Sequence, residues 1–363
     1  MKVLIYGAGI RGGQALDLIK RKYKIDGEVI GFIDNYKIGQ YQGYPIYRLE
    51  EADNLKRRIL IALNDYKTAK DVCLQLQKRG YADIFWFQYK KTVLKHEDFF
   101  TEQCVNCKEW SEDILPQVEM HIMDSCNLNC RGCTHFSPIF SNSIPCLEAR
   151  LSDVKQLKEK ISCIMRFYIL GGEPFLNPEI NDYICGIRRI LPYTQLYIVT
   201  NGLLIDHLSD ETLQCIKENQ VWISISEYQP TRKKIDKICQ ILDEYKILYE
   251  IREASLKEKF CLPLSLSKNS IHPKTCISDG CVIIGDGKIA RCPQLMYISY
   301  FNNHFNTNLP EDGIMELEFC PTGDRLLRVL KEEVPLCRHC VQNEIPWSVC
   351  KKEVKLEDFA VKD

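Results

Sequence analysis

The sequence predicts an α/β protein with two strand–helix alternations and a cysteine-rich extension. Short apolar runs rich in β-branched and aromatic residues alternate with amphipathic stretches over residues 2–87 and again over 118–252. Helices between such runs are typical of parallel sheets, whose strands need crossover connections. Beyond about residue 255 the alternation stops and cysteines return. We therefore expect domains at 1–95 and 117–255, a linker at 96–116, a cysteine-rich domain at 256–350 and a charged, frayed tail at 351–363.

Length, charge and cysteine content narrow the class of protein. The chain has 363 residues, enough for two or three domains, and a formal net charge of −1. A near-neutral chain gives no electrostatic reason to expect nucleic acid or an anionic membrane as a partner, and no apolar run approaches membrane-spanning length. The first residues lack the shape of a signal peptide, so we expect a cytoplasmic protein. There, the 19 cysteines would be metal ligands or buried thiols.

The first alternation begins with a strand, a glycine-rich turn and a helix. Residues 2–6 form an apolar run, residues 7–12 read Gly-Ala-Gly-Ile-Arg-Gly, residues 14–23 are amphipathic, and a second strand at 28–33 ends at an aspartate. Glycines at such a turn allow close backbone approach, and the helix N-terminus can face a phosphate. An acid at the end of the second strand could bond a ribose hydroxyl. The candidate nucleotide-binding residues are Gly7, Gly9, Gly12 and Asp34.

The rest of this region continues as strand, helix and strand at 58–63, 67–79 and 83–87. The stretch Gly31-Phe-Ile-Asp34-Asn, with Gly43-Tyr-Pro45 after it, resembles the N-terminal domain of bacterial sugar acyltransferases, which binds a nucleotide sugar. The resemblance implies a small Rossmann-like domain over 1–95. The alternative is that this domain has the same fold but binds no nucleotide and has only a structural role. In the linker, Cys104-Val-Asn-Cys107 is a lone C-x2-C, for which we expect no catalytic role.

The second alternation predicts strands near 118–123, 166–170, 195–200, 221–226 and 247–252. Helices are predicted near 147–163, 178–191, 207–219 and 231–246. Cysteines within predicted helices are expected to be buried small apolar groups; these include Cys73, Cys163, Cys185, Cys215 and Cys239.

Three closely spaced cysteines follow the first of these strands. Cys126, Cys130 and Cys133 have the spacing C-x3-C-x2-C. Three thiolates on one loop can hold three irons of a 4Fe–4S cluster and leave the fourth iron open to a small chelating ligand. A zinc site or three buried thiols are the alternatives, although a structural zinc site takes four protein ligands and no fourth cysteine is near in the sequence.

This triplet resembles the signature of radical S-adenosylmethionine (SAM) enzymes. In that family the open iron binds the amino and carboxylate groups of SAM, and an electron from the cluster cleaves SAM to methionine and a 5′-deoxyadenosyl radical. The resemblance implies a partial (β/α)6 barrel with its site at the carboxyl ends of the strands. The residue before the third cysteine is usually aromatic in the family, but here it is Gly132. We expect His135 or Phe136 to supply the aromatic packing near adenine.

The ends of the later strands carry polar residues and glycines. Gly171-Gly172-Glu173-Pro174 resembles the family motif that binds the SAM amino group, and the next strand ends resemble the positions that contact the SAM ribose and carboxylate. The cofactor-binding candidates are Gly171, Gly172, Glu173, Pro174, Thr200, Asn201, Ser224 and Ser226. Glu227 and Arg252 are candidate catalytic residues, with a solvated strand end as the alternative for Arg252.

The cysteines beyond residue 255 suggest a second cluster. Two separated pairs of thiolates can hold all four irons of a cluster, and a zinc ion held by four thiolates is the direct alternative. Cys276-x10-Gly287-x4-Cys292, followed by Cys337-x2-Cys340, resembles the auxiliary-cluster (SPASM) domain of radical SAM enzymes in its shortened twitch form. The expected ligands are Cys276, Cys292, Cys337 and Cys340. Cys281 and Cys350 remain rivals for two of these positions.

Together these resemblances imply a radical SAM oxidoreductase that carries SAM and two 4Fe–4S clusters. Its expected substrate is a sugar, nucleotide sugar or cyclitol, which it would oxidise or epimerise, with flavodoxin or ferredoxin as electron donor. A maturase that modifies a ribosomally made peptide and a non-catalytic iron–sulfur sensor are the alternatives.

Overall fold

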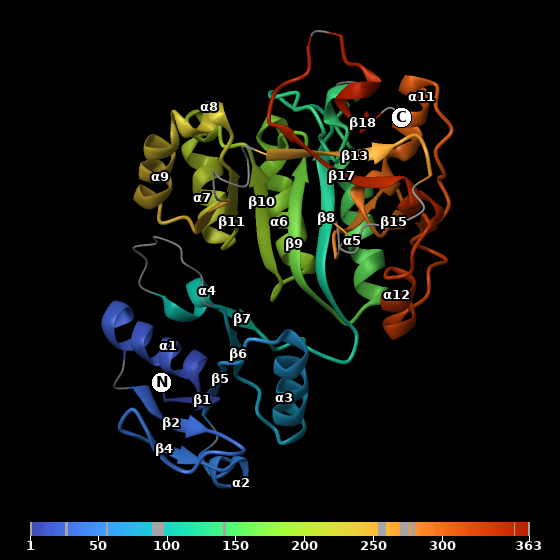
Figure 1. Cartoon of the computed structure of the whole chain (residues 1–363). Coiled ribbons are helices and arrows are strands. Elements are labelled where there is room, and N and C mark those ends of the chain that lie inside the picture. The colour runs from blue at the N-terminus through green and yellow to red at the C-terminus, as the bar shows by residue number, and fades with distance from the viewer. Residues whose placement is uncertain are drawn as a thin grey trace. The chain divides into compact units, whose positions relative to one another are not determined.

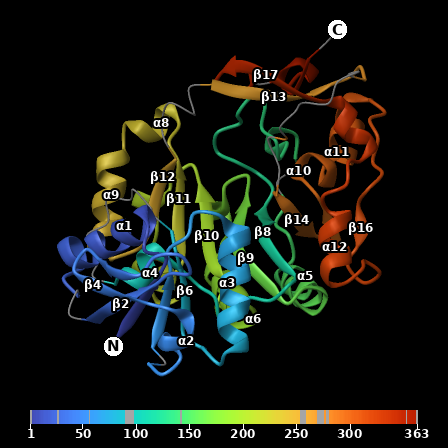
Figure 2. The same cartoon turned by 60° about the horizontal axis from the view of Figure 1, so that its bottom comes forward.

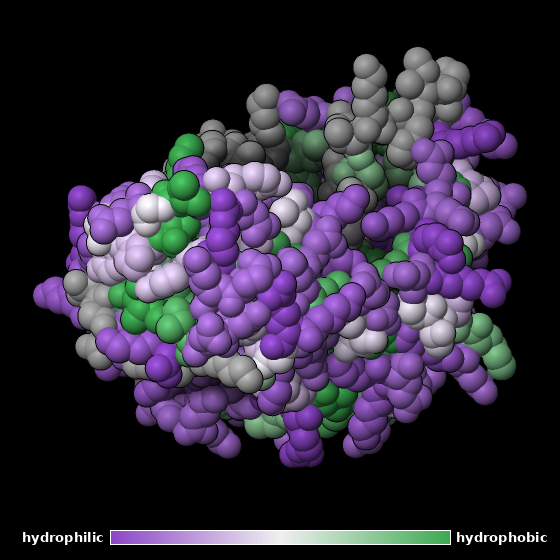
Figure 3. Space-filling model, turned by 90° about the horizontal axis from the view of Figure 1, so that it is seen from below, coloured by the Kyte–Doolittle hydropathy of each residue, from purple (hydrophilic) through white to green (hydrophobic). Residues whose placement is uncertain are grey.

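A computed structural model describes residues 2–25, 28–55, 57–88, 98–140, 143–252, 259–268, 276, 280–351 and 353–361. The chain divides into two compact units between Ile114 and Leu115. Among the described helices, none has the length and apolar character needed to cross a bilayer. The face shown in Figure 3 is largely hydrophilic, with separate hydrophobic patches.

The first unit is built on a seven-stranded sheet in the order β3-β4-β2-β1-β5-β6-β7 (Figure 1). Strand β1 pairs in parallel with both β2 and β5, and β6 pairs in parallel with β5, as the alternation of strands and helices predicts. The strands are β1 (Val3–Tyr6), β2 (Val29–Ile33), β3 (Gly39–Tyr41), β4 (Tyr44–Tyr47), β5 (Arg58–Ile61), β6 (Ile84–Phe87) and β7 (Cys104–Asn106).

Helices α1 and α3 flank this sheet (Figures 1 and 2). The helices are α1 (Ile10–Leu18), which continues as a π-helical turn at Ile19–Tyr23, α2 (Leu49–Ala52), α3 (Tyr66–Lys78) and α4 (Phe99–Gln103). Asp65 caps the N-terminus of α3: its side chain accepts a hydrogen bond from the Thr68 amide at 2.7 Å. Its buried residues recur at helical spacing and face the sheet: Ala69, Val72, Cys73 and Leu76.

Residues 98–106 correct the expectation of a linker at 96–116. Helix α4 packs Phe99 into the core of the first unit, and β7 pairs antiparallel with β6 at the edge of the sheet. Cys104 and Cys107 are both buried there.

The second unit is built on an eight-stranded sheet in the order β12-β11-β10-β9-β8-β14-β15-β16. All five predicted strands are present, and β9, β10, β11 and β12 pair in parallel with one another in that order. The strands are β8 (Ile114–Met123), β9 (Cys163–Gly171), β10 (Gln195–Thr200), β11 (Trp222–Ser226), β12 (Tyr249–Arg252), β14 (Val282–Gly285), β15 (Lys288–Ala290) and β16 (Met315–Glu316).

Helices follow the strands as predicted and form the outer layer of this sheet (Figure 2). They are α5 (Leu147–Lys160), α6 (Ile180–Ile190), α7 (Asp210–Glu218), α8 (Gln229–Arg232) and α9 (Ile235–Glu244). Helix α6 buries Ile180, Tyr183, Ile184 and Ile187 on one face, as expected for a helix packed on a sheet.

Strand β14 was not predicted as part of this sheet. It pairs in parallel with β8, so the cysteine-rich region contributes a strand to the barrel sheet itself. The β14–β15 hairpin turns at Asp286 and Gly287, which both have positive φ, at 52° and 72°. The buried guanidinium of Arg150 on α5 pairs with the Asp286 carboxylate at 2.6 Å and holds the hairpin against the barrel.

The remaining elements surround a second core. They are β13 (Lys259–Ser265), α10 (Pro293–Met296), α11 (Ile298–Phe305), α12 (Gly323–Val329), β17 (Cys340–Pro346) and β18 (Ala360–Val361), and β17, β13 and β18 form a three-stranded sheet. The expectation of a frayed tail is wrong for its described part. Phe359 is fully buried against Phe136 and Phe301, and β18 pairs with β13.

Candidate functional site

The glycine turn of the first unit joins β1 to α1. A Cβ atom at Gly12 would lie 2.0 Å from the Gly7 carbonyl oxygen, so the helix can approach the turn only with glycine there. A Cβ atom at Gly9 would meet nothing within 4 Å. Packing therefore requires a glycine at position 12 of the motif, whereas it does not require one at position 9.

Asp34 lies at the end of β2 beside this turn. Its carboxylate accepts hydrogen bonds at 2.9 Å from the backbone amides of Ala8, Tyr36 and Lys37. Burial alone would raise the pKa of this carboxyl, but the three amide bonds lower it below its ordinary value. Asp34 thus ties the turn to the loop after β2, and its contact with a ribose stays a prediction.

In the second unit a cavity of about 380 Å³ opens at the carboxyl ends of the barrel strands. The structure brings nine of the predicted residues to its wall: Cys126, Cys130, Cys133, Gly171, Gly172, Thr200, Asn201, Ser226 and Arg252. They come from the cysteine loop, defined here as residues 126–133, and from the ends of β9, β10, β11 and β12. Segments separated by more than a hundred residues therefore share one site.

The three thiols of the cysteine loop lie in low-polarity surroundings. Burial raises the pKa of Cys126 and of Cys130 to about 12, and it also raises the pKa of Cys133. Repulsion between the sulfurs, if ionised, contributes to the shifts at Cys126 and Cys130. Clustered sulfurs fit the chemistry of a bound metal group, whose positive charge would stabilise the thiolates.

The Gly171–Pro174 segment is fastened to the end of β8. The Gly172 amide donates to the Met123 carbonyl at 2.8 Å, and the Glu173 amide donates to the Ser125 carbonyl at 3.0 Å. Cβ atoms at Gly171 and Gly172 would lie 2.0 and 2.1 Å from these same backbone oxygens. The two glycines therefore permit a close approach that places this segment beside the cysteine loop.

Glu173 is fully buried behind the cavity wall. Its carboxylate accepts hydrogen bonds from the Thr200 hydroxyl at 2.7 Å, the Asn201 amide at 2.9 Å and the Phe175 amide at 3.3 Å. Burial raises the pKa of Glu173 to about 7, although the hydrogen bonds act in the opposite direction. The carboxyl thus links the ends of β9 and β10 and can change its charge near neutral pH.

Of the predicted residues at the ends of β11 and β12, Arg252 lines the cavity and Ser224 orients it. The buried Ser224 hydroxyl donates to Glu250 at 2.9 Å and accepts from Arg252 Nε at 3.0 Å, which orients Arg252 at the cavity wall. Glu227, expected to be catalytic, is not among the described residues that line the cavity. Its carboxylate lies 3.7 Å from Arg232 on α8.

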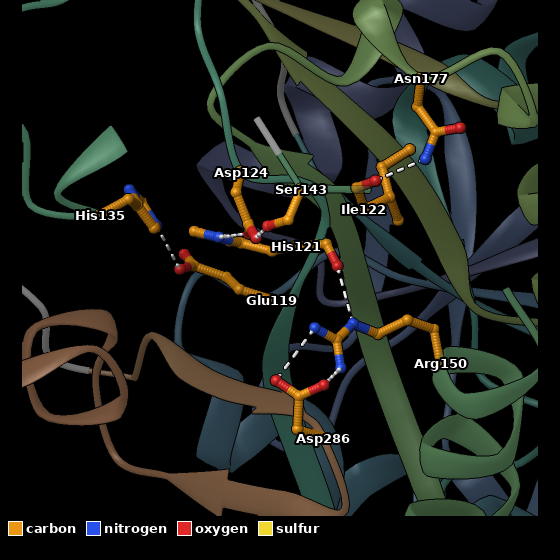
Figure 4. A network of polar contacts seen from close by, with 9 residues as sticks. All are labelled: Glu119, His121, Ile122, Asp124, His135, Ser143, Arg150, Asn177 and Asp286. Atoms are coloured by element: carbon orange, nitrogen blue, oxygen red, sulfur yellow. Dashed lines mark hydrogen bonds and ion pairs between the residues drawn. The ribbon is translucent and has the colours of Figure 1, made fainter. Parts of the chain in front are cut away.

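Glu119 is a cavity residue that the sequence analysis missed. It lies on β8, and one carboxylate oxygen is 3.4 Å from His135 Nε2 (Figure 4). The other oxygen accepts a hydrogen bond from Gln117 Nε2 at 3.0 Å. Burial would raise the pKa of Glu119, but the contact with His135 lowers it. The signal was present in the sequence, because residues 117, 119 and 121 are polar and alternate with apolar ones along the strand.

A buried polar network lies behind Glu119. His121 stacks on Tyr297 with ring centroids 4.4 Å apart, and burial lowers the pKa of His121 to about 4. Its backbone carbonyl accepts from Arg150 Nε at 3.0 Å (Figure 4). His121 is therefore neutral at physiological pH, and the network fixes β8 against α5 and the β14–β15 hairpin.

The expected aromatic packing near the cysteine loop comes from other residues. Phe136 is fully buried in the C-terminal core and does not line the cavity, whereas His135 does. Tyr228 and Phe260 also line the cavity, with ring centroids 6.2 Å apart. Gly132 has a φ of +68°, and a Cβ atom there would lie 2.6 Å from the Cys261 carbonyl oxygen. Strand β13 therefore occupies the space that an aromatic side chain at position 132 would need.

The four expected auxiliary cysteines share a second neighbourhood. Burial raises the pKa of Cys292 and of Cys340 to about 12, with contributions from the other thiols of the set: Cys276 and Cys337 for Cys292, and Cys292, Cys337 and Cys276 for Cys340. Among the described residues, no three His, Cys, Asp or Glu side chains converge tightly enough to hold a single metal ion. A cubane, in contrast, takes each thiolate on a separate iron.

The two rival cysteines have different surroundings. The Cys350 amide donates to the Asn129 carbonyl at 2.7 Å, which places Cys350 against the cysteine loop. Burial raises the pKa of Cys350 to about 11, with Asp358 and Cys133 as further causes. Cys281 lines the main cavity beside Glu119, but besides burial, Cys292 and Cys276 also contribute to its raised pKa, so it lies near the auxiliary cysteines as well and stays a rival for that set.

Residues 120–260 match the sequence profile of the family described as the Radical SAM superfamily. The chain is similar to a GTP 3′,8-cyclase of Helicobacter pylori, with 24% identity over 226 residues, which cover 61% of this chain and 67% of the relative. It is also similar to an S-adenosylmethionine-dependent nucleotide dehydratase of Flammeovirga pacifica, with 28% identity over 117 residues. That alignment covers 31% of this chain and 39% of the relative.

Two solved structures are similar in part. A crystal structure of BtrN in complex with AdoMet and 2-DOIA aligns with a TM-score of 0.39 and 13% identity, covering 63% of this chain and 94% of BtrN. A structure of anSMEcpe with bound AdoMet and a Cp18Cys peptide aligns with a TM-score of 0.31 and 20% identity, covering 38% of this chain and 42% of that one.

Proposed function

Residues 120–260 constitute a radical SAM domain, and on this premise we propose that the protein is a radical SAM oxidoreductase that oxidises or epimerises a small polar substrate. The observation that carries the proposal is the convergence of three cysteines with the Gly171–Pro174 segment, Thr200 and Asn201 at one cavity. The cysteine spacing and the strand-end motifs were identified separately in the sequence, and the fold gives them one location.

In this proposal Cys126, Cys130 and Cys133 hold a 4Fe–4S cluster, and Cys276, Cys292, Cys337 and Cys340 hold an auxiliary one. When bound, these groups supply the electron that cleaves SAM to a hydrogen-abstracting 5′-deoxyadenosyl radical and an acceptor for an electron that leaves the substrate. The pKa values of Cys292 and Cys340 are both raised by burial and in part by other thiols of the auxiliary set, which supports a common site for these cysteines. The contact of Cys350 with Asn129 makes Cys350 the weaker candidate.

The residues of the chain would bind and orient SAM at the strand ends. Glu173 lies behind the cavity wall and accepts hydrogen bonds from Thr200 and from the Asn201 amide, so it would hold these two cavity residues in place for SAM. Asn201 also directs its side-chain amide toward Cys126 Sγ at 3.8 Å. The backbone around Gly171 and Gly172 lies close enough to the cysteine loop to contact a ligand bound there.

The polar groups in the cavity favour a hydroxyl-rich substrate, and we propose a sugar, nucleotide sugar or cyclitol. A buried anionic carboxylate, Glu119, and a guanidinium oriented by Ser224, that of Arg252, line the same space. Such groups can hydrogen-bond substrate hydroxyls and fix which C–H bond faces the radical. The glycine turn and Asp34 of the first unit support a nucleotide-linked form of this substrate.

SAM cleavage by the anaerobically reconstituted protein tests this proposal. We expect release of 5′-deoxyadenosine by the wild type and none by the triple variant Cys126→Ala, Cys130→Ala, Cys133→Ala, which should also lose about four irons per chain. A matched control replaces Cys146, Cys185 and Cys239, three cysteines outside both sets, and should keep iron and activity. Release of 5′-deoxyadenosine by the first triple variant, or none by the wild type with its iron bound, would refute the proposal.

A further inference from the structure

The cysteine loop is paired with a segment that lies more than two hundred residues later. The Arg131 amide donates to the Ser348 carbonyl at 2.9 Å, and Cys130 and Val349 form an antiparallel β-bridge. The Gly132 amide donates to the Asp358 carbonyl at 2.6 Å, and Arg131 Nε lies 2.8 Å from the Asp358 carboxylate. We call residues 347–350 together with Asp358 the C-terminal brace.

One side chain of the C-terminal brace contacts a thiol of the loop directly. The Trp347 indole N–H donates to Cys130 Sγ at 3.3 Å, within the range of a hydrogen bond to sulfur. The same indole stacks on Tyr228 with ring centroids 5.3 Å apart and planes inclined by 23°. Because Tyr228 also lines the cavity and follows β11, Trp347 is held from two sides and its N–H has a defined direction.

We propose that Trp347 is a positioning residue that sets the reduction potential of the group bound to Cys126, Cys130 and Cys133. This inference rests on the proposed function, since it requires a cluster on those cysteines. A hydrogen bond to a cluster sulfur places the positive end of the N–H dipole beside the cluster and stabilises its more negative, reduced form. The bond from Trp347 therefore raises the reduction potential and makes the cluster easier to reduce.

The position of Gly132 supports the same assignment. An aromatic residue there is excluded by the Cys261 carbonyl, 2.6 Å from the place of a Cβ atom. The aromatic surface beside the loop is instead formed by Tyr228, Phe260 and Trp347, whose rings are in mutual contact through Tyr228. The chain thus replaces a local aromatic residue with a distant one that also carries a hydrogen-bond donor.

The test is the midpoint potential of the cluster in the full-length, reconstituted protein. Trp347→Phe keeps an aromatic ring against Tyr228 but removes the N–H, and we expect a midpoint potential more negative than that of the wild type. Trp110→Phe is the matched control, because this buried indole N–H has no hydrogen-bond partner among the described residues and belongs to the first unit. It should leave the potential unchanged.

A second measurement does not depend on the stability of any variant. In wild-type protein labelled with indole ¹⁵N-tryptophan, pulsed electron paramagnetic resonance of the reduced cluster should detect a coupling to the ¹⁵N nucleus. An equal potential in wild type and Trp347→Phe with iron bound in both, or no ¹⁵N coupling in the wild type, would overturn the proposal. Absence of any cluster on the cysteine loop of the wild type would instead contradict the proposed function.

Discussion

The Glu173 carboxylate accepts a hydrogen bond from the Asn201 amide at 2.9 Å and so joins the ends of β9 and β10. The carboxyl is fully buried, and burial raises its pKa to about 7 from an ordinary value of 4.5. The protonated form is therefore favoured in the folded chain over the pH range between these two values.

This shift predicts how stability changes with pH. Between pH 4.5 and about 7 the unfolded chain loses the proton of Glu173 while the folded chain keeps it, so the free energy of unfolding falls as pH rises and the loss is complete above about pH 7. The wild type should lose up to about 3 kcal/mol relative to Glu173→Gln across this window. Denaturant unfolding of both proteins without SAM or iron measures the difference. Parallel pH profiles would contradict it.

Gly132→Ala tests the close approach of β13 to the cysteine loop. Alanine at the φ of +68° is strained, and its Cβ atom would also displace the Cys261 carbonyl, so we expect a loss of at least about 2 kcal/mol in the free energy of unfolding. Gly280→Ala is the control: its φ is +78°, but a Cβ atom there meets none of the described residues within 4 Å. It should cost only about 1 kcal/mol. Equal losses would show that the backbone contact adds nothing.

Substitutions can distinguish the role of the auxiliary thiols from the role of the thiols in the cysteine loop. Cys337→Ala with Cys340→Ala should lower the iron content from about eight to about four per chain, keep SAM cleavage and abolish the oxidised product. Cys350→Ala should keep the auxiliary iron, because this residue contacts Asn129 of the other site. Iron analysis and detection of the oxidised product measure these effects. About four irons in the reconstituted wild type would remove the auxiliary cluster from consideration.

Reaction in deuterated water distinguishes the two chemistries of the proposal. Epimerisation requires return of hydrogen from a thiol, which exchanges with solvent, so the product should carry deuterium at an inverted carbon. Oxidation should give a carbonyl without such deuterium. Mass spectrometry of the product detects the deuterium, and NMR detects the inverted carbon or the carbonyl.

In the first unit, Gly12→Ala should disrupt the turn, because its Cβ atom would lie 2.0 Å from the Gly7 oxygen. Gly9→Ala should keep the fold, since none of the described residues lies within 4 Å of the added atom. Titration calorimetry with uridine, thymidine and adenine nucleotides should show binding to the wild type and weaker binding to Gly9→Ala, because the added methyl group would occupy space that a phosphate at this turn needs. A folded wild type that binds none of them would leave the first unit with a structural role.

Local patterns were sufficient to predict the barrel strands. Strand β10 has the predicted bounds, because its apolar run stops at a Thr-Asn-Gly turn, and α6 shows helical spacing of its buried residues. The motif residues could also be assigned to one site, since the carboxyl ends of parallel strands lie together. Glu119 could have been found from the period-two polarity of β8.

Other features depend on contacts that no local pattern encodes. Strand β14 lies beside β8 with Val282 opposite Val118, and short apolar runs do not specify such distant partners. The spacing of Cys350 fitted the auxiliary set as well as that of Cys340, and only the pairing of its backbone with Asn129 separates them. Glu227 was selected because it ends a strand, but its contact with Arg232 depends on the helix that follows.

The distance in sequence between Arg131 and Asp358, 227 positions, also fixes an order of events during synthesis. The three thiols leave the ribosome long before the segment that pairs with them. At about 5–20 residues per second the interval is roughly 10–45 seconds. During that time the nascent loop lacks the backbone partners and the indole that it has in the finished protein. Metal insertion into the mature geometry is therefore a post-translational step, and a chain truncated before Trp347 would offer its thiols to iron without the contacts that direct them.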